Sequence, residues 1–401
     1  MESPEEPPST GQPGPEQARP RDGSPDPAEL TVVVSTPVPG GSHVLMTSGQ
    51  PGDESLHQFF FDDTGMRPLD GLAEKFGAAL AQGRTLGAGT LLGTVLTGLS
   101  CRAGIETADH IEMSLVDEDG TERYRFSSYR RVWPTNASDL EMLSNLIGPH
   151  APELVGRIEV EVHGRHYILG TCRRTPSGPT VHDLTAARIA AQYFSHEDSV
   201  EVGQTIRYVH DALLLAFPHR WVPAEVIGRH LEERLDGFLP RIPGLAAHAP
   251  WIRESYRSLT GEMLVQRIHG NLTATCIWHQ KNRCIVGGWQ GDVRLRHREH
   301  TSMRSPLHDL ATLQSSIFSA CNYELSWFTK TMSSFFEGYG EPTPTHAICL
   351  FILDTACQET LDLPGAPDHG GRNLGDFLTW FRETFVPHFA EMPLSTFHRR
   401  A

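Results

Sequence analysis

The sequence predicts an α+β fold of two lobes, a β-rich N-terminal lobe and a helical C-terminal lobe, preceded by a small β-rich domain. Three observations predict it. Short runs of β-branched and aromatic residues, separated by glycine turns, fill residues 30–172. From residue 173 onward, apolar residues recur mostly at the 3.6-residue spacing of amphipathic helices. No fixed-period repeat is visible, which excludes a solenoid.

Composition narrows the class of protein. With 401 residues, of which 39% are hydrophobic, the chain is long enough to bury a large core. A formal net charge of -15 argues against a nucleic-acid surface, which needs a basic face. No apolar run reaches the roughly 18–20 residues that span a bilayer, and the N-terminus lacks the layout of a signal peptide. We therefore expect a cytoplasmic protein that binds neither nucleic acid nor membrane.

The seven cysteines are odd in number and scattered, with no CxxC pair among them. This pattern predicts small buried side chains in a reducing compartment, and neither a disulfide framework nor a zinc site. They are Cys101, Cys172, Cys276, Cys284, Cys321, Cys349 and Cys357.

The first two segments differ in composition. Residues 1–29 are mainly Pro, Glu, Gly and Ser, which predicts a disordered acidic tail, either a solubilising leader or a docking peptide. Residues 30–104 form the small β-rich domain, with strands at 30–38, 42–47 and 57–63 and a helix at 71–83. The glycines of residues 86–98 predict an interruption of regular structure.

The β-rich lobe is predicted for residues 105–172. Two hairpins carry alternating apolar residues on both arms, one at 110–131 with its turn at Asp119-Gly120 and one at 157–170 with its turn at Gly164. A helix is predicted between them at residues 137–147.

The helical lobe is predicted for residues 173–401. Two short strands at 276–280 and 283–289 interrupt it. Helices are predicted at 181–194, 201–217, 223–235, 251–268, 305–320, 323–340, 345–361 and 374–389.

Two motifs in this lobe carry chemical information. The first reads Arg267-Ile268-His269-Gly270-Asn271-Leu272-Thr273, and the second reads Gly288-Trp289-Gln290-Gly291-Asp292. They resemble the maltokinase branch of the aminoglycoside-phosphotransferase-like kinases, whose loop reads R-I-H-G-D-L-H and whose metal motif reads D-F-E-G-E. The resemblance implies a kinase-like fold, with residues 30–104 as the maltokinase-type N-terminal cap.

The resemblance extends over about residues 105–360. Residues 305–311 resemble the S-P-L-R-D-V-A helix start, which implies that Asp309 caps or braces the loop of the first motif. His269 matches the family's histidine, which implies that it pins that loop by hydrogen bonds. The family's sugar-site motif, R-N-R-P-x-W, has no counterpart after Glu359, so maltose binding is not implied.

Phosphotransfer requires a carboxylate near the acceptor hydroxyl, groups that hold the metal and a cation on the phosphates. Asn271 stands where the family has its catalytic aspartate, and a neutral amide cannot accept the hydroxyl proton. Cys276 replaces an amide that helps to hold the metal, although magnesium prefers oxygen ligands. Gly288 replaces the metal-binding aspartate and supplies no side chain.

The β-rich lobe has lost matching groups. Ser127 falls on the family's phosphate-contacting lysine, and Glu112 lies where the resemblance places a phosphate loop, at residues 110–114. Cys172 falls in the hinge of the nucleotide cleft. Asp292, four residues after Gly288, is the candidate for restoring a metal ligand.

Four parts of the machinery are thus altered, and we expect a pseudokinase with a regulatory, scaffolding or ligand-sensing role. Its expected partner is a protein, such as an enzyme of α-glucan or trehalose metabolism, with a nucleotide or sugar as a further ligand. The alternative is a slow ATP-dependent sugar phosphotransferase that uses ATP and Mg²⁺, with Asp292 or Asp309 supplying a shifted metal site.

Overall fold

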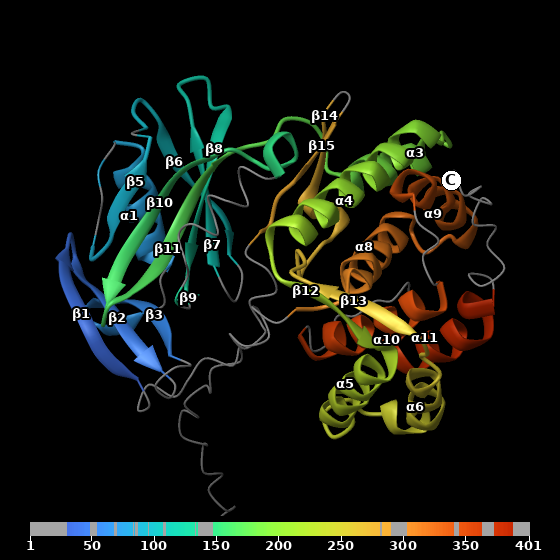
Figure 1. The fold of residues 1–401 in the computed structure, drawn as a ribbon. Coiled ribbons are helices and arrows are strands. Elements are labelled where there is room, and N and C mark those ends of the chain that lie inside the picture. The colour runs from blue at the N-terminus through green and yellow to red at the C-terminus, as the bar shows by residue number, and fades with distance from the viewer. Residues whose placement is uncertain are drawn as a thin grey trace, which may run out of the picture.

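The computed structural model divides into a β-rich part and a helical part that lie side by side (Figure 1). This confirms the predicted α+β fold of two lobes. The tail 1–29, residues 137–146 of the helix predicted at 137–147, and Asp292 lie outside the residues described. The structure describes residues 30–48, 54–67, 70–82, 84, 87–94, 96–106, 110–132, 134, 147–280, 283–289, 303–340, 345–362 and 373–387.

The N-terminal sheet is antiparallel and has five strands. Its four consecutive strands are β1 (Thr31–Val38), β2 (Gly41–Ser48), β3 (Ser55–Asp62) and β4 (Gly65–Arg67). The fifth strand, β9 (Arg131–Val132), comes from the next lobe and pairs with β3. Helix α1 (Asp70–Leu80) follows the sheet. The strands and helix predicted for residues 30–83 are therefore confirmed.

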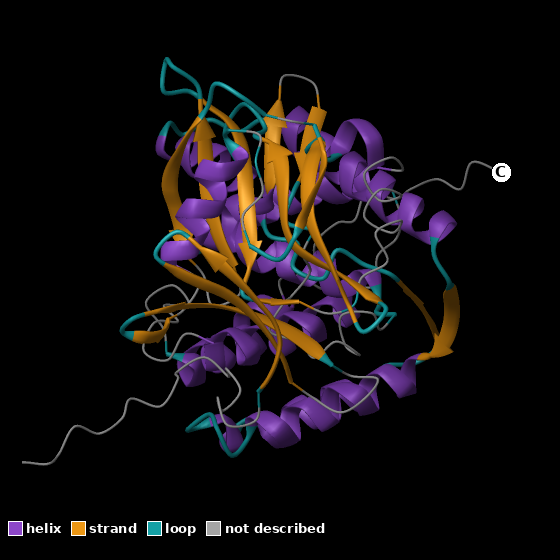
Figure 2. Cartoon of the chain, turned by 90° about the vertical axis from the view of Figure 1, so that its left-hand side faces the viewer, coloured by secondary structure: helices purple, strands orange, loops and turns teal. Residues whose placement is uncertain are grey.

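The second sheet has six strands in the order β5-β10-β11-β8-β7-β6, and Figure 2 shows the β-rich part facing the viewer. Both predicted hairpins are confirmed, with their turn glycines Gly120 and Gly164 at φ +77° and +74°, which favours glycine. The strands are β5 (Thr90–Gly93), β6 (Ser100–Glu106), β7 (His110–Val116), β8 (Glu122–Tyr129), β10 (Leu154–Val162) and β11 (Arg165–Arg174).

The sheet begins earlier in the chain than expected. Strand β5 lies in the stretch where glycines predicted an interruption, and that prediction is wrong. Gly93 allows the strand to approach β10 closely, because a Cβ at this position would overlap the backbone at Val155. β5 and β6 thus precede residue 105 and still belong to this sheet.

Several helices of the helical lobe begin with side-chain caps. Thr180, Ser195 and Asn373 each accept a hydrogen bond from the backbone N–H three residues later. The helices are α3 (Val181–Ala190), α4 (His196–Ala216), α5 (Ala224–Phe238), α6 (Ala249–Arg257), α8 (Pro306–Ala320), α9 (Leu325–Tyr339), α10 (Thr345–Asp362) and α11 (Leu374–Trp380), which continues as a π-helical turn over Phe381–Phe385.

One predicted helix, at 251–268, is wrong in its second half. Helix α6 ends at Arg257, Gly261 has a φ of +87°, and residues Glu262–Gln266 form strand β13. β13 pairs with β12 (His219–Pro223), and its buried residues Met263 and Val265 alternate with more exposed ones. Within the described residues, no helix is long and apolar enough to cross a membrane.

Candidate functional site

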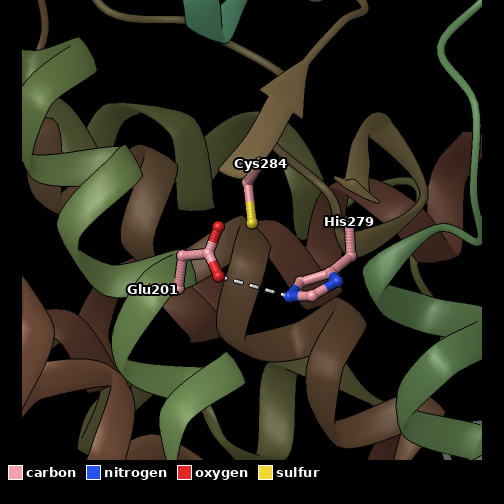
Figure 3. Close-up of side chains that lie close together, drawn as sticks. All are labelled: Glu201, His279 and Cys284. Atoms are coloured by element: carbon pink, nitrogen blue, oxygen red, sulfur yellow. Dashed lines mark ion pairs between the residues drawn. The ribbon is translucent and has the colours of Figure 1, made fainter. Parts of the chain in front are cut away.

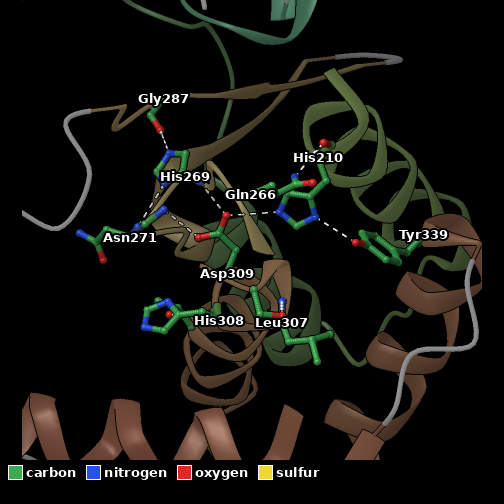
Figure 4. A network of polar contacts seen from close by, with 12 residues as sticks. His210, Gln266, His269, Asn271, Gly287, Leu307, His308, Asp309 and Tyr339 are labelled. Carbon is green, nitrogen blue, oxygen red and sulfur yellow. Dashed lines mark hydrogen bonds and ion pairs between the residues drawn. The ribbon is translucent and has the colours of Figure 1, made fainter. Parts of the chain in front are cut away.

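The loop of the first motif follows β13 and is held by a carboxylate from the first turn of α8 (Figure 4). Asp309 is fully buried and accepts hydrogen bonds from the backbone N–H groups of His269, at 2.7 Å, and Gly270, at 2.8 Å. Hydrogen bonds to an ionised acceptor are stronger than neutral ones. The expectation that Asp309 braces this loop is confirmed.

A second contact keeps Asp309 ionised. His210 of α4 donates from Nε2 to Asp309 Oδ2 over 3.3 Å, and its Nδ1 lies 2.9 Å from the hydroxyl oxygen of Tyr339. Burial alone raises the pKa of Asp309, but the hydrogen bond from His210, together with the one from the backbone of Gly270, outweighs it and holds the pKa below its usual range. The carboxylate thus anchors three elements of the lobe.

His269 links the two motifs. Its Nε2 donates to the carbonyl oxygen of Gly287 over 2.7 Å, and its Nδ1 accepts from the backbone N–H of Asn271 over 3.4 Å. Burial lowers the pKa of His269, more strongly than the charge of Asp309 raises it, which favours the neutral ring. Trp289 packs against this ring with 4.7 Å between ring centroids. With both nitrogens engaged, the ring holds the two loops in register.

The structure brings the three altered positions of the helical lobe together. Cys276 Sγ lies 3.8 Å from the carbonyl oxygen of Asn271, and a Cβ on Gly288 would lie 2.9 Å from the same sulfur. Cys276 belongs to a single 3₁₀ turn, Ala274–Cys276, that leads into strand β14 (Ile277–Gln280), and β15 (Arg283–Val286) returns to Gly288. No carboxylate stands in the described segments 267–280 and 283–289.

The altered positions of the β-rich lobe lie in strands. Ser127 is buried on β8, opposite Thr171 of β11 and Glu112 of β7. Cys172, expected in the hinge, instead lies inside β11, where it packs in the core of this lobe and burial raises its pKa to about 12. β11 continues to Arg174, so residues 175–179 make the connection to α3.

The phosphate loop expected at residues 110–114 is also wrong. These residues belong to β7, because Ile111, Met113 and Leu115 alternate into the core. The carboxylate of Glu112 is paired, because it lies 3.5 Å from both His110 Nε2 and Arg125 Nη1. It therefore does not act as an unpaired charge that repels phosphates. Residues 107–109, between β6 and β7, lie outside the described part of the chain.

A cavity of about 320 Å³ lies beside the first loop, and the sequence analysis missed it. Thr273 and Thr275 line one side, and His182 of α3 and the region of helices α8 to α11, including Glu359, line the rest. Aromatic rings form a large part of the wall, and neither Lys nor Arg is among the described residues that line it. The rings include Phe318, Phe328, Phe377, Trp380, Phe381 and Phe385. At helical spacing these rings could not be distinguished from core residues, so the sequence offered no separate signal.

No protein-family model matches the chain. Among solved structures, it is similar to a glucosamine kinase in complex with glucosamine, ADP and inorganic phosphate, with 17% identity and a TM-score of 0.56 over 93% of this chain and 96% of that one. A second crystal form of glucosamine kinase gives 16% identity and a TM-score of 0.58, over 94% and 96% of the two chains. These likenesses extend over nearly the whole length and establish the kinase-like phosphotransferase fold.

Proposed function

We propose that this protein is a maltokinase-like pseudokinase, catalytically impaired, that acts as a regulatory, scaffolding or ligand-sensing protein linked to maltose-1-phosphate and α-glucan metabolism. One observation carries the proposal. The two loops of the motifs are pinned to each other and to α8 by Asp309 and His269, while the positions they bring together are Asn271, Cys276 and Gly288. The two loops thus keep a fixed arrangement around three positions that carry no negative charge.

The chemistry of these groups supports impairment. Asn271 cannot take a proton from a hydroxyl, Cys276 offers a soft sulfur to a hard cation, and Gly288 offers nothing. Removing one such group typically reduces the rate by about 10²- to 10⁴-fold. Asp309, the carboxylate that contacts the first loop, already accepts from two backbone amides and from His210. It is therefore committed to holding the loop.

The aromatic cavity supports a ligand-sensing role. It reaches the loop at Thr273, whose hydroxyl donates to Cys276 Sγ over 3.2 Å. Since Glu359 lines it and no Lys or Arg is among its described lining residues, the cavity favours an uncharged ligand, such as a sugar, over a phosphorylated one. A ligand there would touch the same segment that carries the altered motif.

The test combines binding and turnover. ATP is titrated by calorimetry with and without Mg²⁺, and transfer of phosphate to maltose and to glucosamine is measured for the wild type and for the triple variant N271D/C276N/G288D. We expect no measurable wild-type turnover. Wild-type turnover within about tenfold of an ordinary kinase rate of 1–100 s⁻¹ would refute the pseudokinase.

The alternative, a slow sugar phosphotransferase with a shifted metal site, makes a different forecast. It requires weak but Mg²⁺-dependent wild-type transfer that Asp292→Asn abolishes. Binding of maltose without transfer supports the sensor, and a protein that binds neither nucleotide nor sugar acts as a scaffold.

A further inference from the structure

A second cluster of polar side chains lies on the hairpin β14–β15, away from the aromatic cavity (Figure 3). His279 of β14 and Cys284 of β15 are directly opposite each other in the register of this antiparallel pair. Residues opposite in such a pair project on the same face, with Cβ atoms about 4.5–5.5 Å apart. Glu201 of α4 points toward both, so three elements converge on one point.

The donor atoms have the spacing of a metal site. His279 Nε2 lies 3.4 Å from Glu201 Oε2, and the three donor atoms of Glu201, His279 and Cys284 all lie within 4.8 Å of one another. In tetrahedral zinc sites, bonds of 2.0–2.3 Å separate neighbouring donors by about 3.3–3.8 Å. Only small rotations of side chains separate the observed arrangement from that geometry.

Buried atoms in this cluster have no hydrogen-bond partner. His279 Nε2 and Glu201 Oε1 are enclosed and form no hydrogen bond with the described part of the chain. Cys284 is fully buried. Enclosed polar atoms that lack a hydrogen bond are costly and rare, and each therefore calls for a partner. A cation among the three donors satisfies all of them at once.

A fourth donor is close. Asp198 Oδ1 lies 3.3 Å from His279 Nε2, while its Oδ2 faces Arg188. The set of one sulfur, one nitrogen and two carboxylates suits zinc.

An ion pair of His279 with the two carboxylates is the competing explanation, but it does not involve the sulfur of Cys284. That sulfur lies within 4.8 Å of the donor atoms of both Glu201 and His279, and Cys284 is directly opposite His279 in the hairpin. When a divalent metal binds, the thiol proton leaves to solvent as the metal–sulfur bond forms.

We propose that Glu201, His279 and Cys284, with Asp198 as the fourth ligand, form a structural zinc site that clamps the hairpin β14–β15 to helix α4. Cysteine spacing alone predicted no zinc site, because its ligands come from distant segments. The two ends of this hairpin lead to Cys276 and Gly288. The zinc site would therefore hold the two motif loops in place, and it takes no part in phosphotransfer. Four protein ligands leave no open position, as in structural rather than catalytic zinc sites.

The test uses the full chain, freed of any affinity tag and of metal, and titrated with Co²⁺ and Zn²⁺. We expect one metal per chain by elemental analysis and, with Co²⁺, the absorption band of a cobalt–thiolate bond. Cys284→Ser should abolish the band, and Cys284→Ser and Glu201→Gln should each weaken zinc binding by at least about tenfold. The control Cys349→Ser removes a buried thiol of α10 and should keep both the band and the affinity.

Three outcomes would overturn the site: no cobalt–thiolate band in the folded wild type, a band that survives Cys284→Ser, or zinc binding unaffected by Glu201→Gln. If Cys284→Ser fails to fold, the cobalt titration of the wild type and the zinc affinity of Glu201→Gln still test whether the site exists. Because the readouts are metal content and absorption, they stand independently of whether the protein turns out to be a pseudokinase.

Discussion

Asp309 accepts a hydrogen bond from the backbone N–H of His269 over 2.7 Å, across 40 positions of sequence. The next amide, of Gly270, donates to the other oxygen of the same carboxylate. Helix α8 thus holds the loop that carries Asn271 without help from nucleotide or metal. For the proposed pseudokinase, this arrangement would keep the loop in place without the reacting groups of a kinase.

Asp309→Asn should destabilise the fold. An amide in this position keeps one acceptor and turns a donor toward a backbone N–H, so a charge-assisted hydrogen bond is lost inside the core. We expect the free energy of unfolding to fall by about 1.5–3 kcal/mol in urea titrations. Asp236→Asn is the control, since this exposed carboxylate pairs only at the surface with Arg253 and its loss should cost less than about 1 kcal/mol. Equal effects of the two variants would contradict the bracing role.

Stability should decline on mild acidification. Burial lowers the pKa of His43, His57 and His308 from 6.5 to about 4. A histidine with a lowered folded-state pKa contributes stability that is complete above pH 6.5 and is lost as the pH falls toward 4. Each such residue adds up to about 1.4 kcal/mol per pH unit in that window. The pKa of Asp309 is also lowered on folding, from an ordinary value of 3.8, so its contribution to stability is complete above pH 3.8 and is lost only below it. The two effects therefore fall in separate pH ranges.

His308→Gln isolates one of these contributions. We expect the decline in the free energy of unfolding between pH 6.5 and 4.5 to become shallower by about 1.4 kcal/mol per pH unit at most. Exposed His346→Gln serves as the control. An unchanged slope in His308→Gln would show that this ring is not held neutral.

Local patterns in the sequence were sufficient for much of the fold. Gly120 and Gly164 mark hairpin turns because the backbone there needs a positive φ, and alternation of apolar residues identifies the strands around them. Strand β13 was missed because Met263 follows Leu259 by four positions, as on one face of a helix, and only pairing with β12 decides between the two structures.

The sites depend on contacts that no local pattern encodes. Motif resemblance brought Asn271, Cys276 and Gly288 together correctly, since their loops flank a single hairpin. Glu201 and Cys284 lie more than eighty positions apart, so their meeting follows from the packing of α4 against β15. Register errors misplaced the phosphate loop, because a strand such as β7 has few residues that distinguish one alignment from the next.

Gly203→Ala should be strongly destabilising. Helices α4 and α9 pack so closely that a Cβ on Gly203 would overlap the carbonyl oxygen of Phe335, and one on Gly338 would overlap that of Val200. Backbone cannot move aside as a flexible side chain can, so we expect a loss of about 1–3 kcal/mol or more. Exposed Gly237 in α5 is the matched control, because a Cβ there meets nothing within 4 Å. Gly237→Ala should stabilise the protein by roughly 0.5–1 kcal/mol, and a loss in Gly203→Ala no larger than this gain would argue against close helix packing.

Gly288 and Cys276 should be energetically coupled. Gly288 has a φ of +72°, which costs a residue with a side chain about 1–2 kcal/mol, and its added Cβ would lie 2.9 Å from Cys276 Sγ. Gly288→Ala should therefore destabilise the protein through both backbone strain and contact with the sulfur. In the Cys276→Ala background only the strain remains, so a double-mutant cycle in urea should give a coupling energy of about 0.5 kcal/mol or more. Strict additivity would mean that the two loops are further apart than the structure shows, and an aspartate restored at 288 would then stand away from position 276.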